Sequence, residues 1–379
     1  MKKIGICFGG YCPMHQGHLD VIMRAKKEND ICFVIVCGYD NEPRSWEINL
    51  NLNERYNLIK DLFKKDEQII VKSINDTELG IDESMSDHNW LTWQNKVKEF
   101  IDDKFKYIKN TYMLANNGNL IKTDTDHLIT WYVAEPFYKT AIERNNVLDA
   151  NVILIEKINP VSGTLIRHTP LNYWSKIAYP FKSYLCKNIL ILGTASEGKS
   201  TLVRDIGTYF DIPYAIEFGR AYMEHKHMQD TDLTIDDFKN FLTGQINLCN
   251  VMRDKSKNGI FISDTDNCVT LMYAKAYSTN PEMQINEDDY KVLYNEAKRL
   301  HENNKFKWDH IFIFPPSKEF VNDGSRYMGQ SSMEERNKNF EILQKLVQEF
   351  YPEVSKTYLN RSFLENFNEV KNYINSLYQ

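Results

Sequence analysis

The sequence predicts two α/β domains, each built around a mostly parallel sheet. The chain has 379 residues, which exceeds the ~250–300 residues that one hydrophobic core usually supports. A buried-strand pattern at residues 4–8 leads into a glycine-rich loop and an amphipathic helix, and the same succession restarts at residues 188–192. Apolar runs alternate with helical stretches after both starts, which is typical of parallel strands joined by helical crossovers.

The alternation defines the expected elements in chain order. In the first domain we expect strands at 4–8, 31–37, 68–71 and 151–155, and helices over 18–28, 53–63 and 89–105. In the second we expect strands at 188–192, 259–263 and 310–314, a helix beginning near Lys199 and a short apolar run at 212–216. The restart falls at about residues 180–187, so we assign 1–182 to the first domain and 183–379 to the second.

Composition bounds the class of protein. Apolar residues make up 42% and charged residues 26% of the chain, which is globular composition. The net charge of −6 argues against a basic nucleic-acid-binding surface. The 7 cysteines form an odd set without a CxxC pair, which favours a reducing compartment. No apolar run approaches the ~20 residues that span a bilayer, so we expect no membrane contact and a cytoplasmic protein.

The first glycine-rich loop predicts a phosphate site. Gly9, Gly10 and Tyr11 follow the first strand, and His15 and His18 stand where the helix begins. A helix N-terminus presents N–H groups and a positive dipole end to anions, and both imidazoles could donate to phosphate oxygens. A metal site and a purely structural role are the alternatives, although two histidines alone match zinc poorly. The spacing resembles GxFxPxHxGH, the signature of the nicotinamide-mononucleotide adenylyltransferases, with Tyr11 in place of Phe.

A second segment supplies the cation that the first loop lacks. Residues 161–167 resemble ISxTxxR, the other signature of this superfamily, with Val in place of Ile. Ser162 and Thr164 suit a helix N-cap whose N–H groups bind phosphate, and Arg167 lies one turn later. A solvated arginine is the alternative. A mononucleotide phosphate is already an anionic nucleophile, so its attack on the α-phosphorus of ATP requires positioning and charge neutralisation rather than a general base.

The second glycine-rich loop predicts a P-loop. Residues 193–200 fit GxxxxGK[ST], with a strand before and a helix after. Lys199 is expected to reach the β- and γ-phosphates, and Ser200 to ligate Mg²⁺ carried by ATP. The residues predicted to bind phosphate here are Gly193, Glu197, Gly198, Lys199, Ser200 and Thr201.

Acidic residues follow the next strand of the second domain. We place Asp264 near Mg²⁺ as a catalytic residue and expect Asp264 or Asp266 to act as the base toward an acceptor hydroxyl. Asp266 is also assigned to the substrate site. A capped turn before the next helix is the alternative for the pair.

Two further segments complete the predicted second site. Residues 322–327 with Arg326, followed by Arg336, are interpreted as a lid that carries arginines over the transferred phosphoryl group. An exposed helical arginine is the alternative for Arg336. Glu217 and Arg220 are predicted to line the acceptor pocket.

The order of the two signatures resembles the bifunctional NadR proteins of bacteria. Residues 167–174, 217–220, 264–266 and 323–326 resemble further segments of that family. The resemblance implies a Rossmann-like nucleotidyltransferase domain followed by a P-loop kinase domain. It implies that the kinase converts ribosylnicotinamide to nicotinamide mononucleotide (NMN) with ATP and Mg²⁺. The first domain then joins NMN to AMP from ATP, which gives NAD and pyrophosphate.

Some NadR proteins also carry an N-terminal helix-turn-helix. Because the first strand begins at about residue 3, we expect none here and no direct DNA binding. Two other functions stay open from the residues alone. One is another nucleotidyltransferase, for cytidylyl transfer or phosphopantetheine, fused to an unrelated P-loop kinase. The other is a nucleotide-sensing regulator without turnover. The oligomeric state also stays open, with a homo-oligomer among the alternatives.

Overall fold

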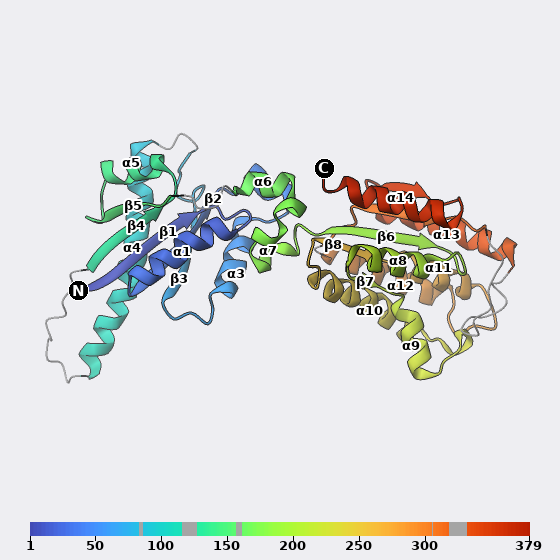
Figure 1. Cartoon of the computed structure of the whole chain (residues 1–379). Helices are drawn as coiled ribbons and strands as arrows, with labels where there is room; N and C mark the ends of the chain where they lie inside the picture. The colour runs from blue at the N-terminus through green and yellow to red at the C-terminus, as the bar shows by residue number, and fades with distance from the viewer. Residues whose placement is uncertain (83–85, 116–126, 157–160, 305, 318–331) are drawn as a thin grey trace. The chain divides into compact units, whose positions relative to one another are not determined.

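The computed structural model describes residues 1–82, 86–115, 127–156, 161–304, 306–317 and 332–379, with the side chains of Trp46 and residues 107–115 left aside. The chain forms two compact units, Met1–Tyr184 and Leu185–Gln379 (Figure 1). Within the described residues each unit holds one five-stranded sheet in which all neighbouring strands are parallel. The predicted fold class, two α/β units with parallel sheets, is confirmed.

The first unit has the strand order β3-β2-β1-β4-β5. The order reverses direction at the central strand β1, and ligands of such sheets bind beyond the carboxyl ends of the strands at this point. The strands are β1 (Lys2–Gly9), β2 (Ile31–Gly38), β3 (Ile69–Asn75), β4 (His127–Val133) and β5 (Asn151–Leu154). The helices are α1 (Gln16–Glu28), α2 (Pro43–Glu47), α3 (Leu52–Leu62), α4 (Asp87–Ala115), α5 (Pro136–Arg144), α6 (Gly163–His168), the 3₁₀ helix η1 (Pro170–Lys176) and α7 (Tyr179–Lys182).

The second unit repeats this plan with the order β10-β9-β6-β8-β7. Its central strand β6 precedes the second glycine-rich loop, so both loops occupy equivalent places in their sheets. The strands are β6 (Lys187–Gly193), β7 (Tyr214–Ala215), β8 (Ile260–Ser263), β9 (His310–Phe314) and β10 (Ser355–Tyr358). The helices are α8 (Lys199–Phe210), α9 (Phe218–Lys226), η2 (Asp230–Asp232), α10 (Ile235–Asp254), α11 (Asn267–Ser278), α12 (Glu287–Asn303), α13 (Met333–Phe350) and α14 (Phe363–Ser376).

Strands β2 and β6 are buried along almost their whole length, as is typical of parallel strands with helices on both faces of the sheet. In the first unit the core against α4 is aromatic: the Phe8 ring lies 4.9 Å from that of Trp93 and 5.9 Å from that of Trp131, centroid to centroid. This packing fixes the end of β1, from which the first glycine-rich loop leaves. Among the described helices, none combines the length and apolar character that a bilayer crossing requires.

Two strands were missing from the sequence prediction. β4 lies between β1 and β5, and its residues 128–133 form an apolar and aromatic run that was a usable strand signal. β10 lies at the sheet edge, where polar side chains alternate on a half-exposed strand. An edge strand of this kind has no buried run, so its sequence resembles that of a loop.

Candidate active sites

The first glycine-rich loop brings the two predicted histidines together. His15 is the N-cap of α1, and its backbone N–H donates to His18 Nδ1 at 3.3 Å. The two rings lie 3.8 Å apart between centroids, and the Tyr11 ring meets His18 edge-on at 4.9 Å. His15 is buried, whereas His18 is half-buried. The helix start therefore fixes both imidazoles beside the loop.

The second signature packs onto this loop. Ser162 is the N-cap of α6, and its Oγ accepts from Leu165 N–H at 3.2 Å. Arg167 donates from Nη1 to Cys12 O at 2.7 Å and from Nη2 to Thr164 Oγ1 at 3.3 Å. A Cβ on Gly163 would lie 3.0 Å from Cys12 O, so the glycine permits this close approach. The structure thus joins the two signatures, which are far apart in sequence.

Two more arginines reach the same loop, and sequence reasoning missed both. Arg55 of α3 is fully buried, donates to Glu42 Oε2 at 2.6 Å and contacts Gly10 O through Nη1. Arg44 of α2 pairs with the same carboxylate and is 42% exposed. A Cβ on Gly10 would lie 2.8 Å from Arg44 Nη1, so the Arg44 guanidinium lies against the loop. The sequence feature that could have connected Arg44 and Arg55 with this loop is their position, because both follow β2, the strand beside β1.

A buried carboxyl group stands near these arginines. Asp76 follows β3 and is 8% exposed, and its Oδ1 has no hydrogen-bond partner within the described residues. Burial raises the pKa of Asp76 to about 6, against the opposing charges of Arg44 and Arg55. The arginines beside the first loop therefore stand near a buried carboxyl group whose pKa is raised.

The second loop has the backbone of an anion cradle. Ser196 and Gly198 adopt positive φ values of 62° and 87°, and turns of this kind direct successive N–H groups toward an anion. A Cβ on Gly193 would lie 2.7 Å from Phe314 O, so only glycine fits beside β9. Lys199 Nζ donates to Thr194 O at 2.7 Å. Thr201, one residue beyond Ser200, is exposed on the first turn of α8.

Asp264 faces this loop as predicted from its position after β8. It is 2% exposed, and the Ser200 hydroxyl hydrogen-bonds to its carboxylate. Burial, followed by the charge of Glu217, raises its pKa to about 6, while Ser200, Lys199 and Arg220 act in the opposite direction.

The donor set around Asp264 suits magnesium. Asp264 Oδ1 is buried without a hydrogen-bond partner among the described residues, and a hydroxyl oxygen stands beside it. Hard oxygen donors of this kind fit Mg²⁺ that is shared with nucleotide phosphates. The described residues hold no cluster of three or more His, Cys, Asp or Glu that would form a protein-only metal cage.

Asp266 has a different place from its neighbour. Its Oδ1 caps α11 by accepting from Cys268 N–H at 2.9 Å, and Tyr351 OH donates to Oδ2 at 2.5 Å. The described residues that line the cavity containing Glu217 and Arg220 do not include Asp266. The geometry matches the capped-turn alternative for Asp266 rather than a substrate contact.

The lid prediction divides into two parts. Arg326 lies outside the described residues. Arg336, at the start of α13, is 2% exposed rather than presented on a helix surface. It pairs with Glu197 and donates from Nη2 to Ala195 O at 3.1 Å, and Glu197 also accepts from the N–H and Oγ of Ser317, each at 3.2 Å. Arg336 and Glu197 therefore stabilise the P-loop itself. This position of Arg336 differs from the predicted one over the transferred phosphoryl group.

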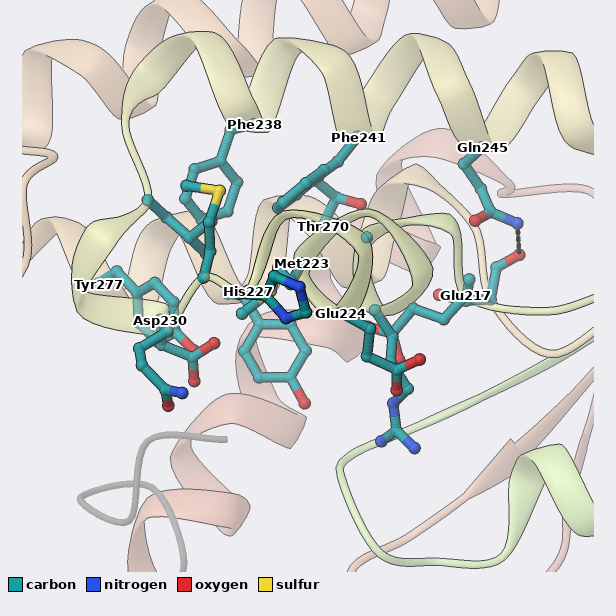
Figure 2. Close-up of a pocket in the computed structure, with 17 residues that line it drawn as sticks. Glu217, Met223, Glu224, His227, Asp230, Phe238, Phe241, Gln245, Thr270 and Tyr277 are labelled. Carbon is teal, nitrogen blue, oxygen red and sulfur yellow. Dashed lines mark hydrogen bonds between the residues drawn. The ribbon is translucent and has the colours of Figure 1, made fainter. Parts of the chain in front are cut away.

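Beside the P-loop, Glu217 and Arg220 line a cavity of about 440 Å³ (Figure 2). The charges of both residues act on Asp264, so this end of the cavity adjoins the P-loop. Tyr277 and Asp230 stand at the other end in Figure 2. Polar residues, among them Glu224, His227 and Thr270, line the cavity together with an apolar and aromatic set: Met223, Met228, Leu233, Phe238, Phe241 and Tyr273.

Comparisons with known proteins agree with this layout. A cytidylyltransferase-like family model matches residues 6–169, and an AAA-domain model matches residues 188–358. The chain is 26% identical over 341 residues to the trifunctional NAD biosynthesis/regulator protein NadR of Salmonella typhimurium, which is 87% of this chain and 73% of that protein. The Escherichia coli protein of the same name is 25% identical with the same coverage.

Solved structures match across both units. The crystal structure of NadR protein in complex with NR superposes with a TM-score of 0.81 at 26% identity, and the match covers 99% of this chain and 96% of that one. The structure of NadR protein in complex with NAD and AMP-PNP shares the fold, with a TM-score of 0.79 at 24% identity.

The two parallel sheets, each with a glycine-rich loop after its central strand, define a two-domain protein with nucleotidyltransferase and P-loop folds. The relatives and the solved structures that match most of the chain are NadR proteins. The chain is NadR-like.

Proposed function

We propose that the chain is a bifunctional enzyme of NAD biosynthesis. Its second unit phosphorylates ribosylnicotinamide to NMN with ATP, and its first unit transfers AMP from ATP to NMN, which gives NAD and pyrophosphate. The observation that carries this proposal is the cavity between Glu217 and Asp230, because it adjoins a complete P-loop and has room for a nucleoside. The first unit carries the adenylyltransferase signature, and relatives named for NAD biosynthesis support the pair of reactions.

In the kinase reaction the reacting groups meet at the Glu217 end of the cavity. Lys199 and the P-loop amides orient the β- and γ-phosphates, and Ser200 and Asp264 would hold Mg²⁺ on them. Bound Mg²⁺ supplies charge neutralisation on the phosphates. Glu217 lies close enough to Asp264 for its charge to raise the pKa of that residue. It is placed to accept the proton of the attacking hydroxyl, since Asp266 points elsewhere.

The far end of the cavity suits the base of the substrate. Ribosylnicotinamide carries a pyridinium ring with a positive charge, and aromatic faces with nearby carboxylates favour such cations. Tyr277 and Asp230 stand at this end (Figure 2), and Phe238 and Tyr273 also line the cavity. A cationic nucleoside is therefore a better fit here than an anionic one.

In the adenylyl transfer the chain supplies positioning and positive charge. His15 and His18 lie at the start of α1, where they would donate to phosphate oxygens of ATP. Arg167 and Arg44 flank the loop from opposite segments of the chain, near Cys12 and Gly10. No general base is needed, because the attacking phosphate of NMN is already ionised.

The test is a time course of the purified chain with ribosylnicotinamide, ATP and Mg²⁺, resolved by chromatography. NMN that rises before NAD is the expected result. NMN without NAD would refute the adenylyl transfer and leave the kinase. Turnover with CTP or phosphopantetheine mixtures but not with these substrates would favour another nucleotidyltransferase, and ATP binding without any product would favour a sensor.

A further inference from the structure

The wall of the acceptor cavity contains a buried glutamine that the reaction above does not use. Gln245 of α10 is 3% exposed. Its Oε1 accepts from Phe218 N–H at 2.8 Å, and its Nε2 reaches Ile216 O at 3.4 Å. These two backbone groups lie on either side of Glu217. The side-chain amide therefore holds the backbone that carries this carboxylate.

The same amide also reaches the segment that carries Asp264. Its Nε2 lies 3.5 Å from Ser263 Oγ and 3.5 Å from Thr265 O, the two residues that flank Asp264. Ser263 Oγ in turn donates to Thr265 O at 2.7 Å. The Gln245 side chain thus contacts the residues before and after Glu217 and the residues before and after Asp264.

The contacts require both a donor and an acceptor on one side chain. Oε1 faces an N–H group and Nε2 faces carbonyl and hydroxyl oxygens, so glutamate would lose the donor and methionine would lose both groups. The residue before Gln245, Gly244, lets α10 come close enough to α9 for these contacts. A Cβ on Gly244 would lie 2.2 Å from the Phe218 ring, so glycine lets α10 approach the start of α9.

We infer that Gln245 is a positioning residue for phosphoryl transfer. It fixes the separation between Glu217, which faces the acceptor hydroxyl, and Asp264, which faces the P-loop. The inference rests on the proposed kinase function. Small displacements of reacting groups cost large factors in rate, because the bound geometry supplies much of the catalysis.

The test compares Gln245→Glu with a matched control in the full chain. Cys249→Ala changes the same buried cluster, since Cys249 Sγ lies 3.6 Å from Gln245 Nε2 and from Ser263 Oγ. Unlike Gln245, its hydrogen-bond contacts among the described residues do not include the backbone on either side of Glu217. For Gln245→Glu we expect a ~10²-fold fall in kcat/KM for ribosylnicotinamide, mostly in kcat. The KM for ATP and the rate of adenylyl transfer should match wild type. Cys249→Ala should stay within about 3-fold of wild type.

Three outcomes would overturn the inference. They are wild-type kcat/KM in Gln245→Glu, an equal loss in Cys249→Ala, and a parallel rise in the KM for ATP that signals general loosening. If Gln245→Glu does not fold, Gln245→Met gives the same comparison without the buried charge. A wild-type chain that makes no mononucleotide refutes the proposed kinase itself, whereas an active wild type with an unaffected variant refutes only the role of Gln245.

Discussion

Both nucleotide loops are fastened by a buried arginine, but the carboxylate that balances the charge stands in different places. Arg55 contacts Gly10 O in the first unit and pairs with Glu42, which lies outside the loop beyond β2. Arg336 donates to Ala195 O in the second unit and pairs with Glu197, which belongs to the P-loop. The second loop therefore contains the carboxylate that pairs with its buried arginine. The first loop is held by an arginine and a carboxylate that both come from other segments of the chain.

The two loops also differ in how they present positive charge. The P-loop relies on its backbone and on Lys199 within the same run of residues. The first loop is surrounded by side chains from elsewhere, with Arg44 at Gly10 and Arg167 at Cys12. A site formed by one continuous loop should lose activity when residues of that loop are substituted. A site formed by several segments should lose activity when residues far away in the sequence are substituted. The experiments below test that contrast.

The largest effect is expected from Lys199→Ala. Loss of the P-loop cation should lower the kinase rate by ~10³-fold, because no other side chain of the loop supplies positive charge to the transferred phosphoryl group. Adenylyl transfer from NMN should be unchanged. Arg204→Ala, which removes an exposed cation from the same helix, is the control and should retain both rates. Full kinase turnover in Lys199→Ala would contradict this placement of the site.

The next effect tests the distant anchor of the first loop. Arg55→Met leaves Glu42 buried, and removing one partner of a buried ion pair costs about 3–5 kcal/mol of unfolding free energy. Arg44→Met is the matched control. Its side chain is 42% exposed, so its pair should contribute at most about 1 kcal/mol, while adenylyl transfer falls because a loop cation is lost.

Urea unfolding followed by tryptophan fluorescence measures this difference. All of the tryptophans except Trp308 belong to the first unit, so the signal reports mainly on that unit. Equal destabilisation by the two arginine variants would show that burial of Arg55 is not the deciding factor.

His18→Ala should have a smaller effect than Lys199→Ala. We expect adenylyl transfer to fall by ~10²-fold, since one transition-state hydrogen-bond donor is removed while the neighbouring arginines remain. The kinase rate in the same preparation serves as the control. Loss of both activities together would mean that the variant misfolds.

The sequence predicted the features whose residues are adjacent in the chain. It missed those whose residues come together only in the fold. The strand, loop and helix successions gave the α/β class and both loops, because their residues are adjacent in the chain. Arg44 and Arg55 reach the first loop, and Asp76 comes near these arginines, only through the order of β1, β2 and β3. Their spacing in the sequence therefore carried no signal. Arg336 was named, but its burial depends on Glu197 and Ser317, and a single arginine does not reveal its partner.

Gln245 gave no sequence signal, because a glutamine on an amphipathic helix normally faces water. The Asp264 and Asp266 pair shows the same limit from another side. Two carboxylates two residues apart in sequence point to different places, since the residue at the N-cap of α11 must turn toward the helix N–H groups.

The smallest expected effect comes from Asp76→Asn and concerns stability. Burial raises the pKa of Asp76 from 3.8 to about 6, so between these values the unfolded chain ionises while the folded chain keeps its proton. Stability therefore falls as pH rises through this window, and above it the loss amounts to about 2–3 kcal/mol. Asparagine removes this loss, so the variant should be more stable than wild type at pH 8 and similar near pH 4.

Urea unfolding across this range, read by tryptophan fluorescence, measures the difference in stability between Asp76→Asn and wild type. A gain that is the same at every pH would show that ionisation of Asp76 does not limit the stability of the first unit. The raised pKa of Asp264 makes a useful contrast, because there asparagine should abolish kinase turnover whatever it does to stability.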